Sequence, residues 1–184
     1  SDVVRFNSNK VQRHINRILD DSVRKQRTII YVLKARQTGI STWTEGKIFH
    51  RVHFTPNQRT AVIAHDYTGS ENVYNMSRMF YDNLSPEWQP LTKYSTKKQL
   101  VFENPSKAGR LAAPGLRSRI DVFTAGRNTS GRSFNFNAVH LSEFAYFNDG
   151  QKLYESLLPA VPKSPGNFVI AETTANGVDN FSYG

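Results

Sequence analysis

The sequence predicts an α/β fold in which helices flank a mainly parallel central sheet. Short apolar runs rich in β-branched residues, such as "TIIYVL" at 28–33 and "TAVIAH" at 60–65, have the composition of strands buried on both faces. Segments with helical spacing of apolar residues lie between such runs. Strands that alternate with helices along one chain build parallel sheets, and this alternation predicts the fold class.

Four segments are expected to be helical. Between 9 and 27, apolar side chains recur at helical spacing among basic residues, at Val11, Ile15, Ile18 and Leu19, which predicts an amphipathic helix. The segment from Ser41 to about Phe54 has no proline and carries several large apolar residues. A third helix at 69–83 is expected to end at "SPEWQP", and a fourth is expected near 150–158.

Seven strands are expected. Four are buried apolar runs, at 28–33, 60–65, 137–143 and 167–173. Three shorter strands, separated by Gly, Pro and Ser, are expected at 97–104, 109–115 and 118–126. The chain shows no internal repeat and no low-complexity segment, so 184 residues predict one domain.

Composition limits the kind of site and partner. The chain has no cysteine, which excludes disulfides and thiolate metal sites and fits a reducing compartment. No run of 18 apolar residues occurs, so we expect a soluble protein with no membrane partner. The balance of 24 Lys+Arg against 15 Asp+Glu gives a net charge of +9, which favours a polyanionic partner.

Three buried runs end in polar residues: "YVL" leads to "KARQTGIST", "AVHL" leads to "SE", and "FVIA" leads to "ETTANG". Because ligands of doubly wound α/β proteins sit beyond the carboxyl ends of the strands, these residues predict one shared site. Each motif alone is weak, and their convergence is the main argument from the residues.

The loop "KARQTGIST" partly fits a phosphate-binding loop, whose pattern is Gly-x4-Gly-Lys-Ser/Thr. Gly39 matches the second glycine and Ser41 the hydroxyl, but Lys34 replaces the first glycine and Ile40 replaces the lysine. Lys34 and Arg36 still place two cations on the loop. The alternative is a plain strand-to-helix turn in which Ser41 caps the helix, and the loop by itself leaves both open.

The run "NAVHLSE" places Glu143 at a strand end, where an acid can activate water or support Mg²⁺. Ser142 stands where an aspartate would be usual, so a metal shell would use the hydroxyls of Ser41 and Ser142, phosphate oxygens and water. A solvated strand end is the competing interpretation of Glu143.

The motifs "LKARQTGIST", "GRSFNFNAVHLSEFAYF" and "ETTANG", in this order, resemble the ATPase domain of the large terminase subunit, the DNA-packaging motor of tailed bacteriophages. The resemblance runs from about Phe6 to the last residue. It implies a P-loop NTPase of the ASCE/RecA-like type that hydrolyses ATP with Mg²⁺. In that family a lysine displaced to the start of the loop is a known variant, which Lys34 matches.

The resemblance also implies roles for individual residues. Arg36 would be a cis arginine on the phosphates, Glu143 the catalytic Walker B glutamate, and Arg132 an arginine finger delivered to a neighbouring subunit. The nucleotide site would comprise Gln12, which would read adenine, together with Lys34, Arg36, Gln37, Thr38, Gly39, Ile40, Ser41 and Thr42. The coupling motif would comprise Thr173, Thr174 and Asn176.

By the same resemblance, residues 1–184 form the ATPase domain of a longer protein, with the lid region and the RNase-H-like nuclease domain absent from this chain. We therefore expect no nuclease activity. The implied partners are double-stranded DNA, the portal protein, the small terminase subunit and further copies in a ring, with a monomer in isolation. The implied location is the cytoplasm of an infected bacterial host, at the procapsid portal.

A basic stretch between 93 and 119 is the candidate DNA surface, because loop cations can contact phosphates without reading sequence. Its members are Lys93, Lys97, Lys98, Lys107, Arg110, Arg117 and Arg119. A solvated face is the alternative for any one of them. Two rival classes remain: a superfamily 2 helicase-like ATPase, and a non-enzymatic basic DNA-binding module.

Overall fold

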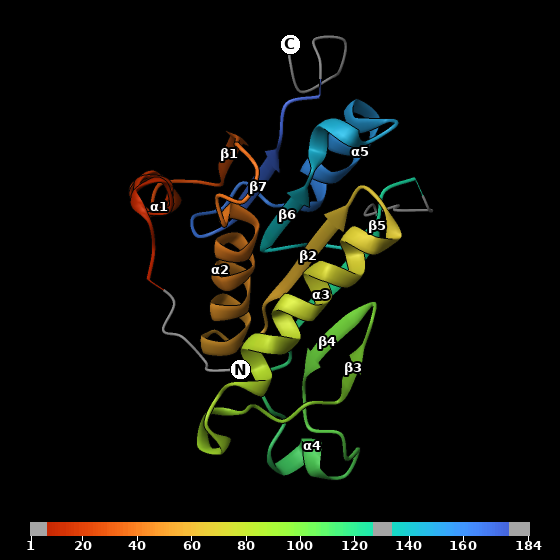
Figure 1. The fold of residues 1–184 in the computed structure, drawn as a ribbon. Helices are drawn as coiled ribbons and strands as arrows, with labels where there is room; N and C mark the ends of the chain where they lie inside the picture. Colours follow the sequence, from red (N-terminus) through yellow and green to blue (C-terminus); the bar gives the residue numbers. More distant parts are fainter. Residues whose placement is uncertain (1–6, 127–133, 177–184) are drawn as a thin grey trace.

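The structure, a computed structural model, describes residues 7–126 and 134–176. Its described part contains a seven-stranded sheet in the order β1-β7-β6-β2-β5-β4-β3 (Figure 1). The strands are β1 Thr28–Leu33, β2 Arg59–Ala64, β3 Tyr94–Thr96, β4 Gln99–Phe102, β5 Ser118–Thr124, β6 Ala138–Ser142 and β7 Phe168–Thr173. The first five strands of the sheet order pair in parallel, while β4 and β3 are antiparallel additions at one edge.

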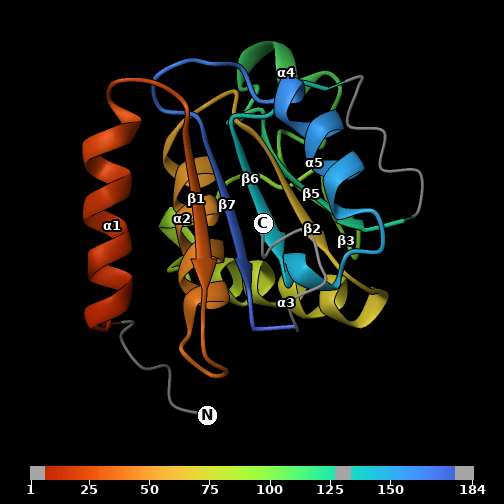
Figure 2. The ribbon, with the colours of Figure 1, turned by 90° about the horizontal axis from the view of Figure 1, so that it is seen from above.

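Helices cover both faces of this sheet. The helices are α1 Lys10–Val23, α2 Ile40–Phe54, α3 Tyr67–Asp82, α4 Gly109–Ala112 and α5 Gly150–Leu157, with 3-10 turns at Pro86–Trp88, Phe144–Tyr146 and Leu158–Ala160. One core cluster joins α1, α2 and α3 to one face, and another joins α5 to the other, and Figure 2 shows α1 and α5 on opposite sides. Val169 and Ile170 belong to different clusters because neighbouring strand residues point to opposite faces. The predicted α/β class with a mainly parallel sheet is confirmed.

One predicted strand is wrong. Residues 109–115 contain the short helix α4 instead, and Leu111 on it is 93% exposed. Local side-chain acceptors explain the turn: Asn104 Oδ1 accepts from Ser106 N at 2.9 Å, and Ser106 Oγ accepts from Gly109 N at 3.1 Å. Apolar composition suggested burial here, but these turns keep the segment on the surface.

The sequence also gave no sign of β3. The predicted strand at 97–104 is reduced to β4, because a two-residue turn at Lys97 and Lys98 joins Thr96 to Gln99 in a tight hairpin. The hairpin extends the sheet beyond β5.

The carboxyl ends of β1, β7 and β6 lie at one edge of the sheet. Leu33 pairs with Thr173 and Ser142 pairs with Glu172, so the chain leaves these three strands at the same level. The polar residues that follow the strands are thereby brought together, as expected for a parallel sheet.

Candidate active site

The loop between β1 and α2 leaves a helix N-terminus open. Gln37 (φ 60°) and Gly39 (φ 69°) both adopt left-handed backbone conformations, and α2 begins at Ile40. No side chain caps this helix, and its first turn carries no acid. Backbone N–H groups of an uncapped helix start favour an anion, so the loop has the physical features of a phosphate site.

Glycine is favoured at position 39. A Cβ built there would lie 2.9 Å from Gln12 Nε2, and a positive φ disfavours any other residue. Gln12 donates from Nε2 to Gly39 O at 2.9 Å, and its Oε1 accepts from Asn9 N at 2.9 Å within the capping box of α1. In this structure the Gln12 amide supports the loop, and its implied role in reading adenine stays a prediction.

A pocket of about 380 Å³ lies beside this loop. It is lined by Lys34, Arg36, Gln37, His65, Glu143, Tyr146 and Thr174. Five of these residues were predicted from the sequence as site residues, and they come from segments that follow β1, β6 and β7. The convergence expected from the three strand-end motifs is therefore present in the structure.

Lys34 lies between two carboxylates. Its Nζ is 3.0 Å from Glu143 Oε1 and 2.9 Å from Glu172 Oε2, and its side chain is only 9% exposed. The contact with Glu143 is a hydrogen bond. The contact with Glu172 is an ion pair without hydrogen-bond geometry. Burial alone would lower the pKa of Lys34, but the contacts with Glu172 and Glu143 outweigh it, and the pKa is raised.

Glu172 is a central residue that the sequence reasoning missed. Its side chain is fully buried at the end of β7, and its Oε1 accepts from Ser41 Oγ at 2.9 Å and from Ser142 Oγ at 3.0 Å. Burial would raise the pKa of Glu172, but His140 and Lys34 outweigh it and lower the pKa to about 2. Its one sequence signal is that it opens the "ETTANG" motif.

His140 and Glu45 continue this polar network into the core. His140 Nδ1 contacts Glu45 Oε1, and its Nε2 lies 3.3 Å from Glu172 Oε1. Burial would lower the pKa of His140, but hydrogen bonds to Glu172 and Glu45 raise it to about 9. The result is a row of alternating charges, from Glu45 through His140, Glu172 and Lys34 to Glu143.

Glu143, which follows β6, is held in place by Thr174, which follows β7. It has a left-handed conformation (φ 55°, ψ 50°), which is uncommon for a non-glycine residue and recurs at functional sites. Its Oε2 accepts from Thr174 N at 3.1 Å and from Thr174 Oγ1 at 3.2 Å. The turn after Glu143 is tied to the same segment, because Ala145 contacts Thr173 Oγ1 and Asn176 Nδ2. The three predicted coupling residues thus contact Glu143 or its turn.

The other predicted site residues lie as follows. The Ile40 side chain is fully buried, so only its backbone can face a nucleotide. Thr42 Oγ1 points to Met76 Sδ on α3, at 3.9 Å, and Thr38 Oγ1 donates to Ala35 O. Arg36 is exposed at the pocket, and no described residue forms an ion pair with it. Arg132 lies outside the described residues.

The predicted DNA-binding residues do not form one patch. Lys97 and Lys98 lie at the carboxyl edge of the sheet, in the β3–β4 turn, while Lys93, Lys107, Arg110, Arg117 and Arg119 lie toward the opposite end, near α4. Four of the seven are ion-paired: Lys93 and Arg110 with Glu103, Lys97 with Glu71, and Arg119 with Asp121. DNA binding by these residues stays a prediction.

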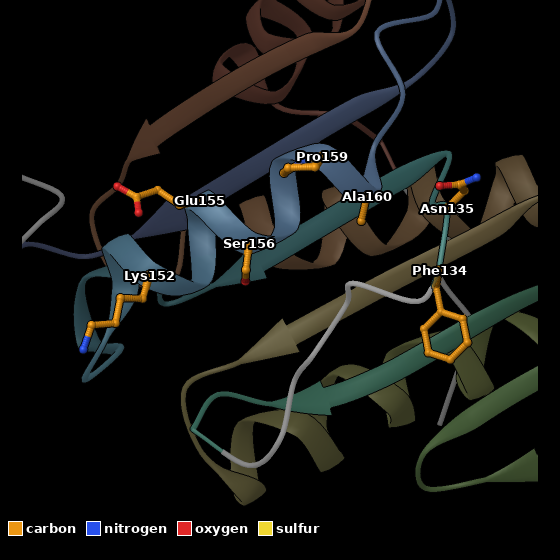
Figure 3. Close-up of a pocket in the computed structure, with 7 residues that line it drawn as sticks. All are labelled: Phe134, Asn135, Lys152, Glu155, Ser156, Pro159 and Ala160. Atoms are coloured by element: carbon orange, nitrogen blue, oxygen red, sulfur yellow. The ribbon is translucent and has the colours of Figure 1, made fainter.

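A second pocket, of about 490 Å³, lies between α5 and the chain leading into β6 (Figure 3). Phe134, Lys152 and Glu155 are among its lining residues, and none of the residues assigned to nucleotide lines it. It carries no group of the candidate site.

Within 7–126 and 134–176, no group of three His, Cys, Asp or Glu side chains is placed to hold a metal ion. The available donors are hard oxygens, the hydroxyls of Ser41 and Ser142 and the carboxylate of Glu172, which suit Mg²⁺. No helix in the described segments has the length and apolar character to span a bilayer.

Comparisons with solved structures show which proteins share this fold. The ATPase domain of the Thermus phage P74-26 large terminase matches with a TM-score of 0.68, 18% identity, and coverage of 95% of this chain and 67% of that chain. A mutant of the same domain matches with a TM-score of 0.70, 18% identity, and coverage of 97% and 69%. The large terminase of bacteriophage HK97 matches with a TM-score of 0.72, 13% identity, and coverage of 98% of this chain and 36% of that one.

The chain has the fold of a phage large terminase ATPase domain. No family model and no curated protein matches the sequence. The predicted fold class, a P-loop NTPase fold with a mainly parallel sheet, agrees with these terminase neighbours. The chain spans about a third of the HK97 terminase.

Proposed function

We propose that this chain is the ATPase motor domain of a viral large terminase, which hydrolyses ATP to move double-stranded DNA into a procapsid. One observation carries the proposal. A cation (Lys34), a candidate base (Glu143) and a coupling residue (Thr174) follow three different strands into one pocket beside an uncapped helix N-terminus. The terminase fold of the chain gives this pocket its functional context.

Phosphates of ATP would bind the N–H groups near Gly39 together with Lys34 and Arg36. Lys34 would then exchange its contact with Glu143 for one with phosphate oxygens. This exchange leaves the Glu143 carboxylate able to accept a hydrogen bond from water in the pocket.

Glu143 would orient this water and take its proton as the oxygen bonds to the γ-phosphorus. The bond between that phosphorus and the bridging oxygen breaks, which gives ADP and inorganic phosphate. Mg²⁺, with Ser41 and Ser142 near it, would neutralise part of the phosphate charge. Thr174 donates hydrogen bonds to Glu143 from its backbone N–H and its hydroxyl. Hydrolysis would therefore change these two bonds and shift the segment after β7.

Assembly would complete the site. Arg132 would act as an arginine finger in a neighbouring subunit, and such a finger contributes about 10³ to 10⁵ in rate. The isolated domain is then expected to be a slow ATPase and a monomer. Portal protein, small terminase subunit and double-stranded DNA are the proposed partners, in the cytoplasm of an infected bacterial cell.

The test is the substitution Glu143→Gln. It should keep ATP binding, because the amide retains shape and hydrogen bonding, and should lower turnover by about 10² to 10⁴ because the base is lost. Glu155→Gln, at an exposed position of α5, is the matched control and should keep full turnover. Unchanged turnover in Glu143→Gln would remove Glu143 from the mechanism.

Two further outcomes would favour the rival classes. A wild-type chain that binds no ATP in the presence of Mg²⁺ would point to the non-enzymatic DNA-binding module. ATP-driven separation of DNA strands without packaging partners would point to a helicase-like ATPase.

A further inference from the structure

Strand β6 ends at Ser142 and Glu143 follows it, so the strand supplies no carboxylate at the position before Glu143. The carboxylate nearest to that position comes from the neighbouring strand. Glu172 on β7 is the direct register partner of Ser142, and its Oε1 accepts a hydrogen bond from Ser142 Oγ at 3.0 Å. The same oxygen accepts from Ser41 Oγ, the hydroxyl of the phosphate loop, at 2.9 Å.

We propose that Glu172 is the metal-shell carboxylate of this site, supplied by β7 in place of the acid that β6 lacks. It would hold the Ser41 hydroxyl with its oxygen toward a Mg²⁺ ion bound with nucleotide, and would offset the charge of that ion. The inference rests on the proposed nucleotide site and adds the residue that makes the site a magnesium site.

Charge balance in the buried row supports this role. Glu172 has no exposed surface, and its Oε2 makes no hydrogen bond with any described residue, so Lys34 is its close cation on that side. If Lys34 moves to phosphate oxygens, one buried carboxylate loses that cation, and an uncompensated buried charge is strongly unfavourable. A divalent cation at the Ser41 hydroxyl would restore the balance, which couples metal binding to the departure of Lys34.

The competing explanation is that Glu172 only ties α2 and β6 to β7. A purely structural tie would affect stability and leave the metal dependence of nucleotide binding unchanged. The two explanations therefore differ in a measurement other than activity.

The experiment measures binding of a non-hydrolysable ATP analogue by calorimetry, with Mg²⁺ and with EDTA. The ratio of the two affinities is the magnesium enhancement. Glu172→Gln should lower this enhancement by about 10- to 100-fold, the usual cost of removing an outer-shell partner of a metal site, while binding in EDTA persists. The matched control is Asp121→Asn, which removes another buried, ion-paired carboxylate far from the loop and should keep the enhancement.

A second variant returns the carboxylate to β6. Ser142→Asp combined with Glu172→Gln should recover most of the enhancement, because the acid again lies beside Ser41. If Glu172→Gln does not fold, as judged by thermal unfolding, this double variant decides alone: recovered enhancement supports the proposal and its absence overturns it.

The remaining outcomes separate the two levels of the argument. A wild-type enhancement that persists in Glu172→Gln overturns the metal role and leaves the proposed ATPase standing. A wild-type chain that binds no nucleotide under either condition overturns the proposed function and this inference together.

Discussion

Lys34→Met offers a direct test of the buried charge row, because methionine keeps much of the length of lysine and removes its charge. In most loops such a change would cost little stability. Here Lys34 is 9% exposed and contacts two carboxylates, at 3.0 and 2.9 Å. Glu143 is 26% exposed and can turn to water, but Glu172 has no exposed surface. The cost therefore falls mainly on Glu172.

Protonation sets the size of that cost. At pH 7, placing a proton on a carboxyl with an ordinary pKa of 4.5 costs about 3.4 kcal/mol, since each pH unit is worth about 1.36 kcal/mol. Removal of one partner of a buried ion pair costs about 3 to 5 kcal/mol in general, so the two arguments agree. We expect Lys34→Met to lower the free energy of unfolding by about 3 kcal/mol at pH 7.

The pH dependence has a definite sign. In the wild type the pKa of Glu172 is lowered to about 2, so its stabilisation is present above pH 4.5 and is lost as the pH falls toward 2. Without Lys34 this pKa rises, so the folded variant binds more protons than the folded wild type as the pH falls. The loss in stability should then be smaller at pH 5 than at pH 7, because protonation of the folded variant costs about 1.36 kcal/mol less for each pH unit. His140, whose pKa is raised to about 9, stays charged over this range.

The assay is urea unfolding of both proteins at pH 7 and pH 5. Arg36→Met is the matched control, since it removes the same charge from an exposed position of the same loop and should change stability by less than about 0.5 kcal/mol. A Lys34→Met protein as stable as the wild type, or a loss independent of pH, would refute the reasoning.

Two further predictions concern the neighbouring subunit and DNA. Arg132→Ala should keep nucleotide affinity and stay inactive alone, yet regain activity when mixed at high concentration with Glu143→Gln protein, which can supply the finger; no recovery in the mixture would contradict delivery in trans. DNA affinity should fall by about 10³ to 10⁵ between 50 and 200 mM salt if six to ten phosphates are contacted, and a flat response would indicate another partner. Alanine at Lys97 and Lys98, compared with alanine at Lys107 and Arg117, should show which end of the sheet binds DNA, because each lost phosphate contact lowers the salt slope by about 1.

The fold could be predicted because its strands are buried on both faces. The run at 168–171 is apolar throughout, since Val169 faces the cluster with α5 and Ile170 faces the cluster with α1 to α3. The antiparallel edge was harder. Segment 109–115 has an apolar composition but lies on the surface, so its composition suggests a buried strand that is not there. Strand β3 is three residues long with exposed ends, which is too short to show a strand pattern in the sequence.

The candidate site divides in the same way. Lys34, Glu143 and Thr174 could be predicted because each follows directly after a strand, and the carboxyl ends of parallel strands meet at one edge. The inner part of the charge row gave no such signal. Glu45 and His140 are 95 residues apart in sequence, and Glu45 looks like an ordinary helix residue until α2 is packed on the sheet. Periodicity shows which face is buried, but not that a buried acid has found a buried histidine.

Glu172 belongs between these two cases. Its place in "ETTANG" was visible, but its importance depends on which strand lies beside β6, and strand order is not written in local sequence. Paired residues on adjacent strands are about 5 Å apart, a distance that one glutamate side chain can span. A carboxylate can therefore move from β6 to β7 and still meet the Ser41 hydroxyl, provided that the strand position it leaves keeps a small hydrogen-bonding residue. Ser142 is such a residue. Its hydrogen bond to Glu172 is the contact expected if the two side chains together replace one aspartate on β6.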